Sequence, residues 1–152
     1  MADAGRLEKI WIKRAKRGPM DPAARVRAVR EFGLEGNANQ GGRRQVTLIS
    51  VEGWAEAAAE VAGEPDPALR RANLLVSGVD LTNSRGKTLE IGAVAIRIYG
   101  ETRPCERMES GHPGLRAALD PDWRAGAYGE ILTDGEIRIG DQVRWIETGE
   151  SP

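Results

Sequence analysis

Apolar and polar residues alternate along several short stretches of the chain, a pattern that is typical of half-buried β-strands. In the first stretch, 7–13, Ile10 and Ile12 fall on one face and Trp11 falls on the other. The stretches on either side of Gly92 predict a hairpin, and the Asp-Gly pair at 134–135 predicts another within a C-terminal meander. Further strands are expected at 43–50, at the apolar end of 70–77, and at 88–91, 94–99, 127–132, 137–139 and 142–146.

Helical spacing is confined to short segments. Ser50 can cap a helix that runs to about Val61, with Trp54 on its apolar side. One helical turn is expected directly after position 105, and another short helix at 115–119. The segment 21–32 fits either a helix or a strand, and its type is left open. Many short strands with few helices predict a mostly β fold: a compact, mainly antiparallel β-barrel with one or two short helices.

The chain has 152 residues, enough for a single domain over 1–152 with its core at about 7–147. Its 22 basic and 23 acidic residues nearly cancel, so neither nucleic acid nor an anionic membrane is expected as a partner. No segment has the pattern of a secretion signal or the length of a membrane span, which predicts a cytoplasmic protein. Basic residues are in excess over 1–30, which indicates either a solvated basic face or a local anionic ligand.

The chain contains a single cysteine, Cys105, which follows Pro104 and lies between Arg103 and Arg107. Positive charge and the start of a helix both favour the thiolate, the form that attacks electrophiles or binds metals. From these residues alone, Cys105 is either a buried, inert residue or a reactive one. With His112 as the single histidine, a zinc site of His and Cys ligands within one chain is excluded, and a serine-protease triad is disfavoured.

Six segments of the chain carry a resemblance to a known family: GLEGN (33–37), RRQVTLIS (43–50), RRANLLVSGVDL (70–81), LEIG (89–92), RPCERM (103–108) and GAYGEILTDGEIRIGDQV (126–143). Together they resemble the MOSC domain, the family named after the C-terminal domain of molybdenum-cofactor sulfurase. Each is a weak signal, but they occur in the family's order and span nearly the whole chain, so the chain looks like a stand-alone member. The resemblance implies a β-barrel with a cleft, a functional Cys105 at the cleft floor, and basic residues that hold an anionic pterin.

Three alternative functions are considered, of which the resemblance implies the first two. In the first, the protein binds the molybdenum cofactor (molybdopterin) and is an oxidoreductase that reduces small N-hydroxylated substrates with electrons from a separate reductase. In the second, Cys105 carries sulfur as a persulfide that it receives from a cysteine desulfurase, and pyridoxal phosphate belongs only to that partner. In the third, the barrel is a non-catalytic binding module. The short chain and Asn37, where the family usually has Asp, favour the third alternative.

The same resemblance assigns residues to the cofactor. The family positions are a basic residue after the first strand, an arginine beyond the glycine-rich loop and an Arg-x-Asn motif. Soft sulfur suits molybdenum, and guanidinium groups suit a phosphate. The predicted cofactor-binding residues are Lys16, Arg17, Asn37, Arg44, Arg71, Asn73 and Arg103, with Cys105 as the metal ligand and catalytic residue.

Overall fold

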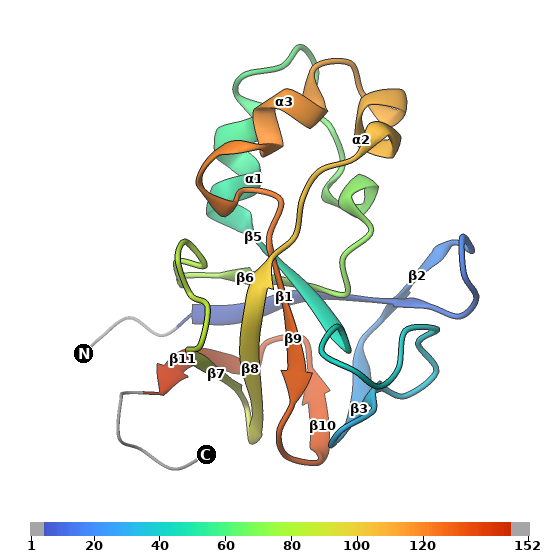
Figure 1. Cartoon of the computed structure of the whole chain (residues 1–152), viewed down its shortest axis with the longest axis vertical. Helices are drawn as coiled ribbons and strands as arrows, with labels where there is room; N and C mark the ends of the chain where they lie inside the picture. Colours follow the sequence, from blue (N-terminus) through green and yellow to red (C-terminus); the bar gives the residue numbers. More distant parts are fainter. Residues whose placement is uncertain (1–4, 147–152) are drawn as a thin grey trace.

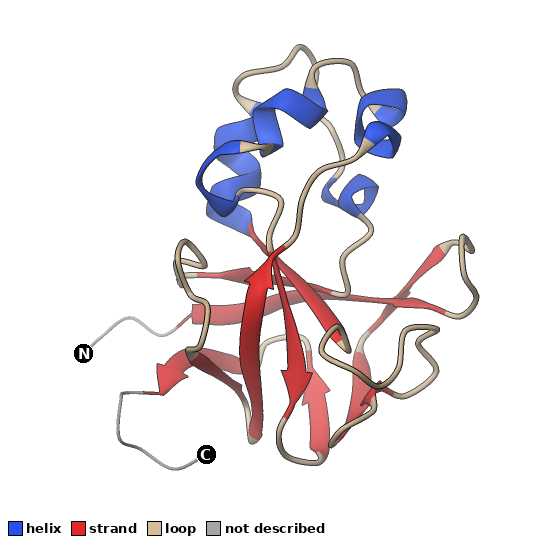
Figure 2. Ribbon diagram, in the orientation of Figure 1, coloured by secondary structure: helices blue, strands red, loops and turns tan. Residues whose placement is uncertain are grey.

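Seven strands close into a β-barrel, which forms the lower part of the molecule in Figures 1 and 2. The computed structural model describes residues 5–146, so the predicted end of the core at residue 147 lies outside the described residues. The strand order is β11-β7-β8-β9-β5-β6-β1, and β1 pairs with β11 to close the barrel. Neighbouring strands are antiparallel except β5 and β6, which confirms the predicted mainly antiparallel barrel. The strands are β1 (Gly5–Lys13), β5 (Val46–Ser50), β6 (Leu74–Ser77), β7 (Thr88–Ile91), β8 (Val94–Glu101), β9 (Ala127–Ile131) and β11 (Gln142–Ile146).

Aliphatic side chains from alternate strand positions fill the barrel. On β1, Ile10 and Ile12 are buried in the barrel core, and Trp11 is buried in a second cluster with residues of the helices, as the alternation predicted. Each fully buried aliphatic side chain contributes roughly 1.5–3 kcal/mol to folding. The largest buried side chains of the barrel core are Leu7, Ile10, Ile12, Leu34, Leu48, Leu74, Leu89, Ile91, Ile96 and Ile98.

Three short α-helices cover one end of the barrel (Figures 1 and 2). They are α1 (Val51–Ala58), α2 (Glu106–Gly111) and α3 (Leu115–Leu119). The Ser50 hydroxyl accepts the Gly53 amide at 2.9 Å and caps α1, as predicted. Beyond α1 the chain makes tighter turns as far as Val61. Two 3₁₀ turns, η1 (Pro67–Arg70) and η2 (Pro121–Trp123), flank the helices, and the second apolar cluster is built from Trp11, Ile49, Trp54, Ala57, Leu75, Met108, Leu115 and Leu119.

The segment 21–32, left open on sequence, is extended at both of its regular parts. The first part belongs to β2 (Met20–Ala23), which pairs with β1. The second is β3 (Arg25–Val29), which forms a separate three-stranded sheet with β4 (Gly33–Leu34) and β10 (Gly135–Arg138). Exposed and buried residues alternate along β3 in the strand period: Arg25, Val26, Arg27 and Ala28.

The hairpin predicted at Asp134-Gly135 is wrong, whereas the hairpin of β7 and β8 around Gly92 is confirmed. Strand β10 pairs with β3 because both edges of β9 are already occupied, by β8 and β5. Neither Asp134 nor Gly135 has the positive φ that a tight two-residue hairpin turn requires. The Asp134 carboxylate instead accepts the Arg30 amide at 2.7 Å, which ties the turn to the end of β3.

Candidate functional site

Cys105 lies where the chain leaves β8 and enters α2, so the predicted position of the thiol at the start of a helix is confirmed. Its backbone is extended, with φ −130° and ψ 179°, and its carbonyl accepts the Met108 amide at 2.9 Å to form the first turn. The side chain is exposed rather than buried. The sulfur is therefore accessible to a ligand, which removes the interpretation of Cys105 as buried filler.

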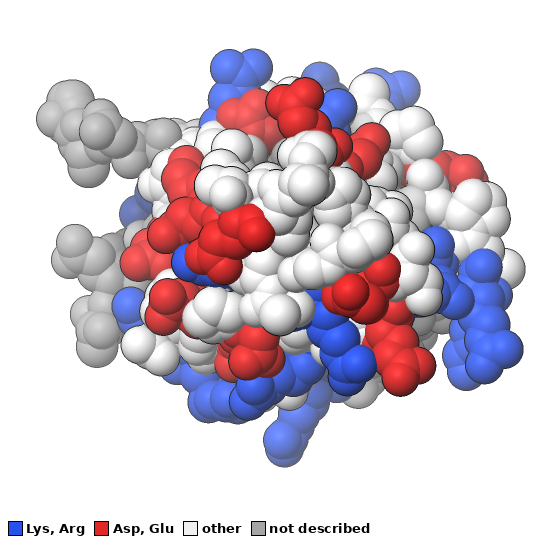
Figure 3. Space-filling model, turned by 90° about the horizontal axis from the view of Figure 1, so that it is seen from above, with Lys and Arg blue, Asp and Glu red and all other residues white. Residues whose placement is uncertain are grey.

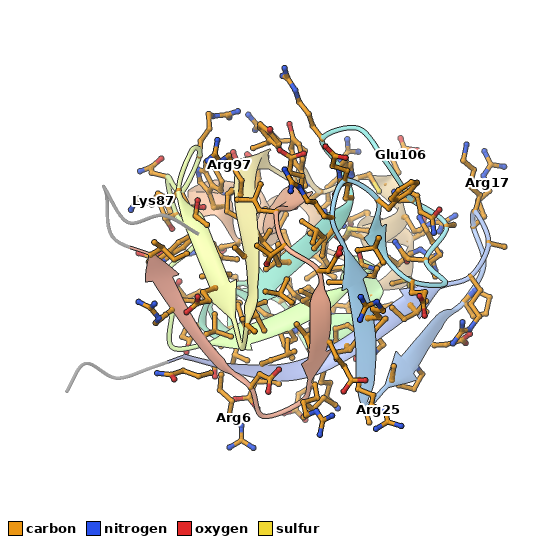
Figure 4. All side chains as sticks on the ribbon, turned by 90° about the horizontal axis from the view of Figure 1, so that it is seen from below. Arg6, Arg17, Arg25, Lys87, Arg97 and Glu106 are labelled. Atoms are coloured by element: carbon orange, nitrogen blue, oxygen red, sulfur yellow. The ribbon has the colours of Figure 1, made fainter. Side chains whose placement is uncertain are left out.

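The thiol lies in an open cleft of about 480 Å³ between the β1–β2 loop, η1 and α2. The cleft lining contains seven basic residues and no acidic residue. Figure 4 shows one of them, Arg17, projecting outward from the β1–β2 loop. None of the seven forms an ion pair with a carboxylate among residues 5–146, whereas six arginines elsewhere on the described chain do. The seven are Lys13, Lys16, Arg17, Arg44, Arg70, Arg71 and Arg107.

A narrow recess of about 40 Å³ adjoins the cleft and shares part of its lining. Asn37, Thr47 and Asn73 belong to the recess, and Lys13 and the two arginines at 44 and 71 line both spaces. The guanidinium of Arg44 lies 5.5 Å from the centre of the Tyr128 ring, a cation–π contact that holds it in place. The recess is thus a polar pit whose mouth is basic.

Asn73 holds three segments of the recess together. Its amide nitrogen donates to the Trp11 carbonyl and to Asn37 Oδ1, both at 3.1 Å. Its amide oxygen accepts the Thr47 backbone amide at 3.1 Å and the Thr47 hydroxyl at 3.3 Å. Asn73 is 5% exposed, so these bonds are made in a largely dry environment and both polar atoms are satisfied. Asn73 therefore acts on the site by fixing β1, β5 and the glycine-rich loop.

Asn37 is buried and lines the recess, at a position where the resemblance noted in the sequence predicts Asp. Its Oδ1 accepts the Lys13 amide at 3.0 Å as well as the amide group of Asn73. Its Nδ2 donates to the Asn39 carbonyl at 3.4 Å, a bond that an ionised carboxylate at this position is unable to make. With Asn at this position all three hydrogen bonds are made, and the lining of the recess carries no negative charge.

Burial and the crowding of cations both lower the pKa of Lys13. Burial lowers the pKa of this lysine, and the charges of Arg71, Arg44 and Arg107 lower it further. Burial also lowers the pKa of Arg71, with Arg107 adding to the effect. Both shifts disfavour the charged forms. An anion bound in the cleft would relieve this repulsion.

Arg70 and Arg71 are adjacent in sequence but have different environments. Arg70 is 6% exposed, and its Nε donates to the Ala125 carbonyl at 2.7 Å. Burial is the main cause that lowers the pKa of Arg70 to about 10; the charge of Arg44 adds to this shift, and Cys105 opposes it. Arg71 has a left-handed backbone, with φ 61°, and its guanidinium donates to the carbonyl of residue 18. The left-handed turn, which is costly for a residue with a Cβ, lets both arginines line the cleft.

The structure gathers most of the predicted site residues. Cys105 and the basic residues at 16, 17, 44 and 71 line the cleft, and the asparagines at 37 and 73 line the recess. Arg103 is not among the cleft residues: it lines a different hollow and lies 3.9 Å from Asp120. His112 contacts the carbonyl of residue 62, away from the cleft. Sequence reasoning missed Lys13, Arg70 and Arg107 as members of the site.

A larger hollow of about 550 Å³ lies between α1, the loop after β6, and η2. Its ionisable lining residues are all acidic, and it does not include Cys105. In Figure 3, which shows the face of the helices, acidic side chains are spread over this face and basic side chains lie mostly toward its edges. The two hollows thus differ in charge, and only the smaller one combines cations with the thiol. Among residues 5–146, no three His, Cys, Asp or Glu side chains come together as a metal site.

The fold and the site define a small β-barrel protein with an exposed thiol in a basic cleft. A family model, MOSC domain, matches residues 35–144, and the chain therefore belongs to the MOSC domain family. This confirms the resemblance noted in the sequence. A comparison with curated proteins found no significant match. None of the helices among residues 5–146 is long and apolar enough to cross a membrane.

Several solved structures share the fold. The YuaD protein from Bacillus subtilis is 21% identical, with a TM-score of 0.77 over 93% of this chain and 94% of that one. YiiM from Geobacillus stearothermophilus is 16% identical, with a TM-score of 0.73 over 95% of this chain and 76% of that one. YiiM from Escherichia coli is 16% identical, with a TM-score of 0.66 over 96% and 72%. At these identities the likeness establishes the fold of small MOSC proteins.

Proposed function

We propose that the cleft binds the molybdenum cofactor, with Cys105 as a ligand of the metal, and that the protein is an oxidoreductase for N-hydroxylated substrates. The MOSC family is associated with molybdenum cofactor in general. The observation that carries the proposal is the cleft itself, which is lined by one exposed thiol and by seven cations that form no ion pair with a carboxylate among residues 5–146. An anionic pterin with a soft metal centre has the matching chemistry.

The residues present fit the parts of this cofactor. Lys13, Arg44 and Arg71, at the mouth of the recess, would hold the phosphate by charge-assisted hydrogen bonds. Cys105 would offer the metal a soft sulfur ligand that solvent and substrate can reach. When bound, the cofactor would supply the electrons for reduction, which come in turn from a separate reductase. Asn73 would act indirectly, because its hydrogen bonds fix the walls of the recess.

The proposal is tested by elemental mass spectrometry on protein made in a host that synthesises the cofactor. We expect near-stoichiometric molybdenum in the parent and its loss in Cys105→Ala and Arg44→Gln. Arg103→Gln is the matched control, because Arg103 is also exposed but faces a different hollow, and this variant should keep its molybdenum. Molybdenum-free parent protein from such a host would refute the proposal.

Activity is tested separately by reduction of benzamidoxime with reduced methyl viologen as the electron donor. The parent should form benzamidine, and Cys105→Ala should not. Protein that carries molybdenum and forms no benzamidine would keep the cofactor and remove the reductase.

A second candidate is favoured by the exposure of Cys105 beside cations, which also suits a persulfide carrier. In that case Cys105 would receive a sulfur atom from a cysteine desulfurase, whose own cofactor is pyridoxal phosphate. Incubation with the desulfurase and cysteine should then add the mass of one sulfur atom to the parent and not to Cys105→Ala. Unchanged mass of the parent would exclude the carrier.

A further inference from the structure

The exposed and partly buried cations of the cleft fall into two groups. Three line both the narrow recess and the wider cleft, so they lie where the two spaces meet. Three others line the wider cleft only, together with the thiol. They come from two elements, the β1–β2 loop and the first turn of α2. We call Lys13, Arg44 and Arg71 the recess group, and Lys16, Arg17 and Arg107 the loop–helix group.

One phosphate does not require both groups. A phosphate monoester carries at most two negative charges at neutral pH, and the recess group alone supplies three positive ones. Within the described chain, no cation of the loop–helix group forms an ion pair with a carboxylate. A cofactor phosphate bound at the recess would therefore leave Lys16, Arg17 and Arg107 without a phosphate partner.

The lining of the cleft does not supply a negative charge, because it contains no acidic residue. The recess does not supply one either: Asn37 lies there, and its oxygen is already used by the Lys13 amide and by Asn73. The cleft has a volume of about 480 Å³, which lies within the usual size range of ligand pockets. The wider part can thus admit a second anionic group next to the thiol.

We propose that the cations of the loop–helix group bind a carboxylate, phosphate or sulfonate of the small molecule that reacts beside Cys105. The substrate of this protein is therefore an anion. The inference rests on the proposed function in one respect, because it takes the reaction to occur at a cofactor held by Cys105. It moves Lys16 and Arg17 from the predicted cofactor-binding set to the substrate side of the cleft. Arg107, from α2, is the third residue of this anion site.

The two groups are separated by titrating the full ¹⁵N-labelled chain with inorganic phosphate at constant ionic strength and following its amide resonances. Two sets of resonances should respond, one near the recess group and one near the loop–helix group. The double variant Lys16→Gln, Arg107→Gln should weaken the second response about ten-fold and leave the first within about two-fold. Arg44→Gln should do the reverse.

Arg30→Gln is the matched control, because Arg30 is exposed and lies outside the cleft. It should leave both responses unchanged. A response at the recess group alone would overturn the inference. An equal response around exposed cations all over the surface would also overturn it, because that pattern is an unspecific ionic atmosphere.

The source of the second anion is tested with the loaded protein and two substrates, benzamidoxime and 4-carboxybenzamidoxime. The parent should prefer the carboxylate in kcat/KM by about ten-fold, and the double variant should lose most of this preference. Equal kcat/KM values in the parent would overturn the inference and leave the proposed function intact. If the protein shows both phosphate responses but never contains molybdenum, the proposed function is refuted. The loop–helix group would then remain an anion-binding site.

Discussion

Arg70 is a buried cation that we expect to lower the stability of the protein. Its side chain is 6% exposed, and burial lowers its pKa to about 10. At about 1.4 kcal/mol for each pKa unit, the drop corresponds to a cost of roughly 3 kcal/mol for keeping the charged form in the folded state at neutral pH. A chain selected for stability alone would not keep such a group.

Replacement of Arg70 by methionine removes the charge and keeps an unbranched side chain. The substitution also removes the hydrogen bond from Nε to the Ala125 carbonyl, which contributes about 1 kcal/mol. That carbonyl keeps a partner, because the Thr102 hydroxyl donates to it at 2.6 Å. We therefore expect Arg70→Met to be more stable than the parent by about 1–2 kcal/mol, in line with other replacements of buried ions by apolar residues.

The assay is urea unfolding at neutral pH, followed by tryptophan fluorescence. With a slope of about 2 kcal/mol per molar urea, the expected gain moves the midpoint up by roughly 0.5–1 M. Arg70→Lys is the matched control: it keeps a buried charge, so it should show no gain. An Arg70→Met protein less stable than the parent would refute the reasoning, because the guanidinium would then stabilise the fold.

The pH dependence gives an independent check with a defined sign. The folded-state pKa of Arg70 lies below the unfolded one, so above about pH 10 the folded state loses this proton first. The unfolded state then binds more protons, and the stability of the parent rises with pH relative to Arg70→Met. The advantage of Arg70→Met should therefore be smaller at about pH 10.5 than at neutral pH.

Three further substitutions test the recess and the barrel. Asn73→Ala should lower the free energy of unfolding by about 3 kcal/mol, because buried groups on three segments lose their hydrogen-bond partner. Asn39→Ala, at the same recess, should have little effect, and equal urea midpoints for the two variants would contradict the prediction. Gly126→Ala should lower the free energy of unfolding by more than about 3 kcal/mol, because a Cβ would lie 2.0 Å from the Leu48 carbonyl oxygen. Gly41 also has a positive φ but has open space around it, so Gly41→Ala should cost about 1 kcal/mol in the same assay. Asn37→Asp should weaken phosphate binding several-fold in a titration, because it adds a negative charge to the recess that Lys13, Arg44 and Arg71 also line. Unchanged affinity would contradict this prediction.

Local patterns predicted the fold where each strand's pairing is decided by its neighbours in sequence. The alternation on β1 sorted Ile12 and Trp11 correctly, because each face packs against a different apolar cluster. The β7–β8 hairpin followed from the turn at Gly92, which has φ 56°. The Asp134-Gly135 turn failed because the pairing of β10 depends on which edges are free in the closed barrel, and no local pattern encodes that.

The candidate site was only partly predictable, because its cations converge from separate elements. Lys13 ends β1, Arg70 ends η1 and Arg107 lies in α2, and nothing in their spacing shows that they share a cleft. Arg103 and Arg107 flank Cys105 symmetrically in sequence, but the helix begins between them. It carries Arg107 into the cleft and leaves Arg103 near Asp120. A sequence signal for Lys13 did exist, since it shares the outward face of β1 with Trp11.

The stability of the fold and the affinity of the cleft are linked through the same uncompensated charge. Repulsion among Lys13, Arg44 and Arg71 and the burial of Arg70 raise the free energy of the folded protein when no anion is bound. A bound anion removes part of that cost, so it binds more tightly than to a cleft whose cations are already paired with carboxylates. Because it binds only the folded chain, it stabilises the protein by an amount that grows with its concentration relative to the dissociation constant. Anion-dependent stability is therefore the thermodynamic signature of a cleft whose counter-charge comes from its ligand.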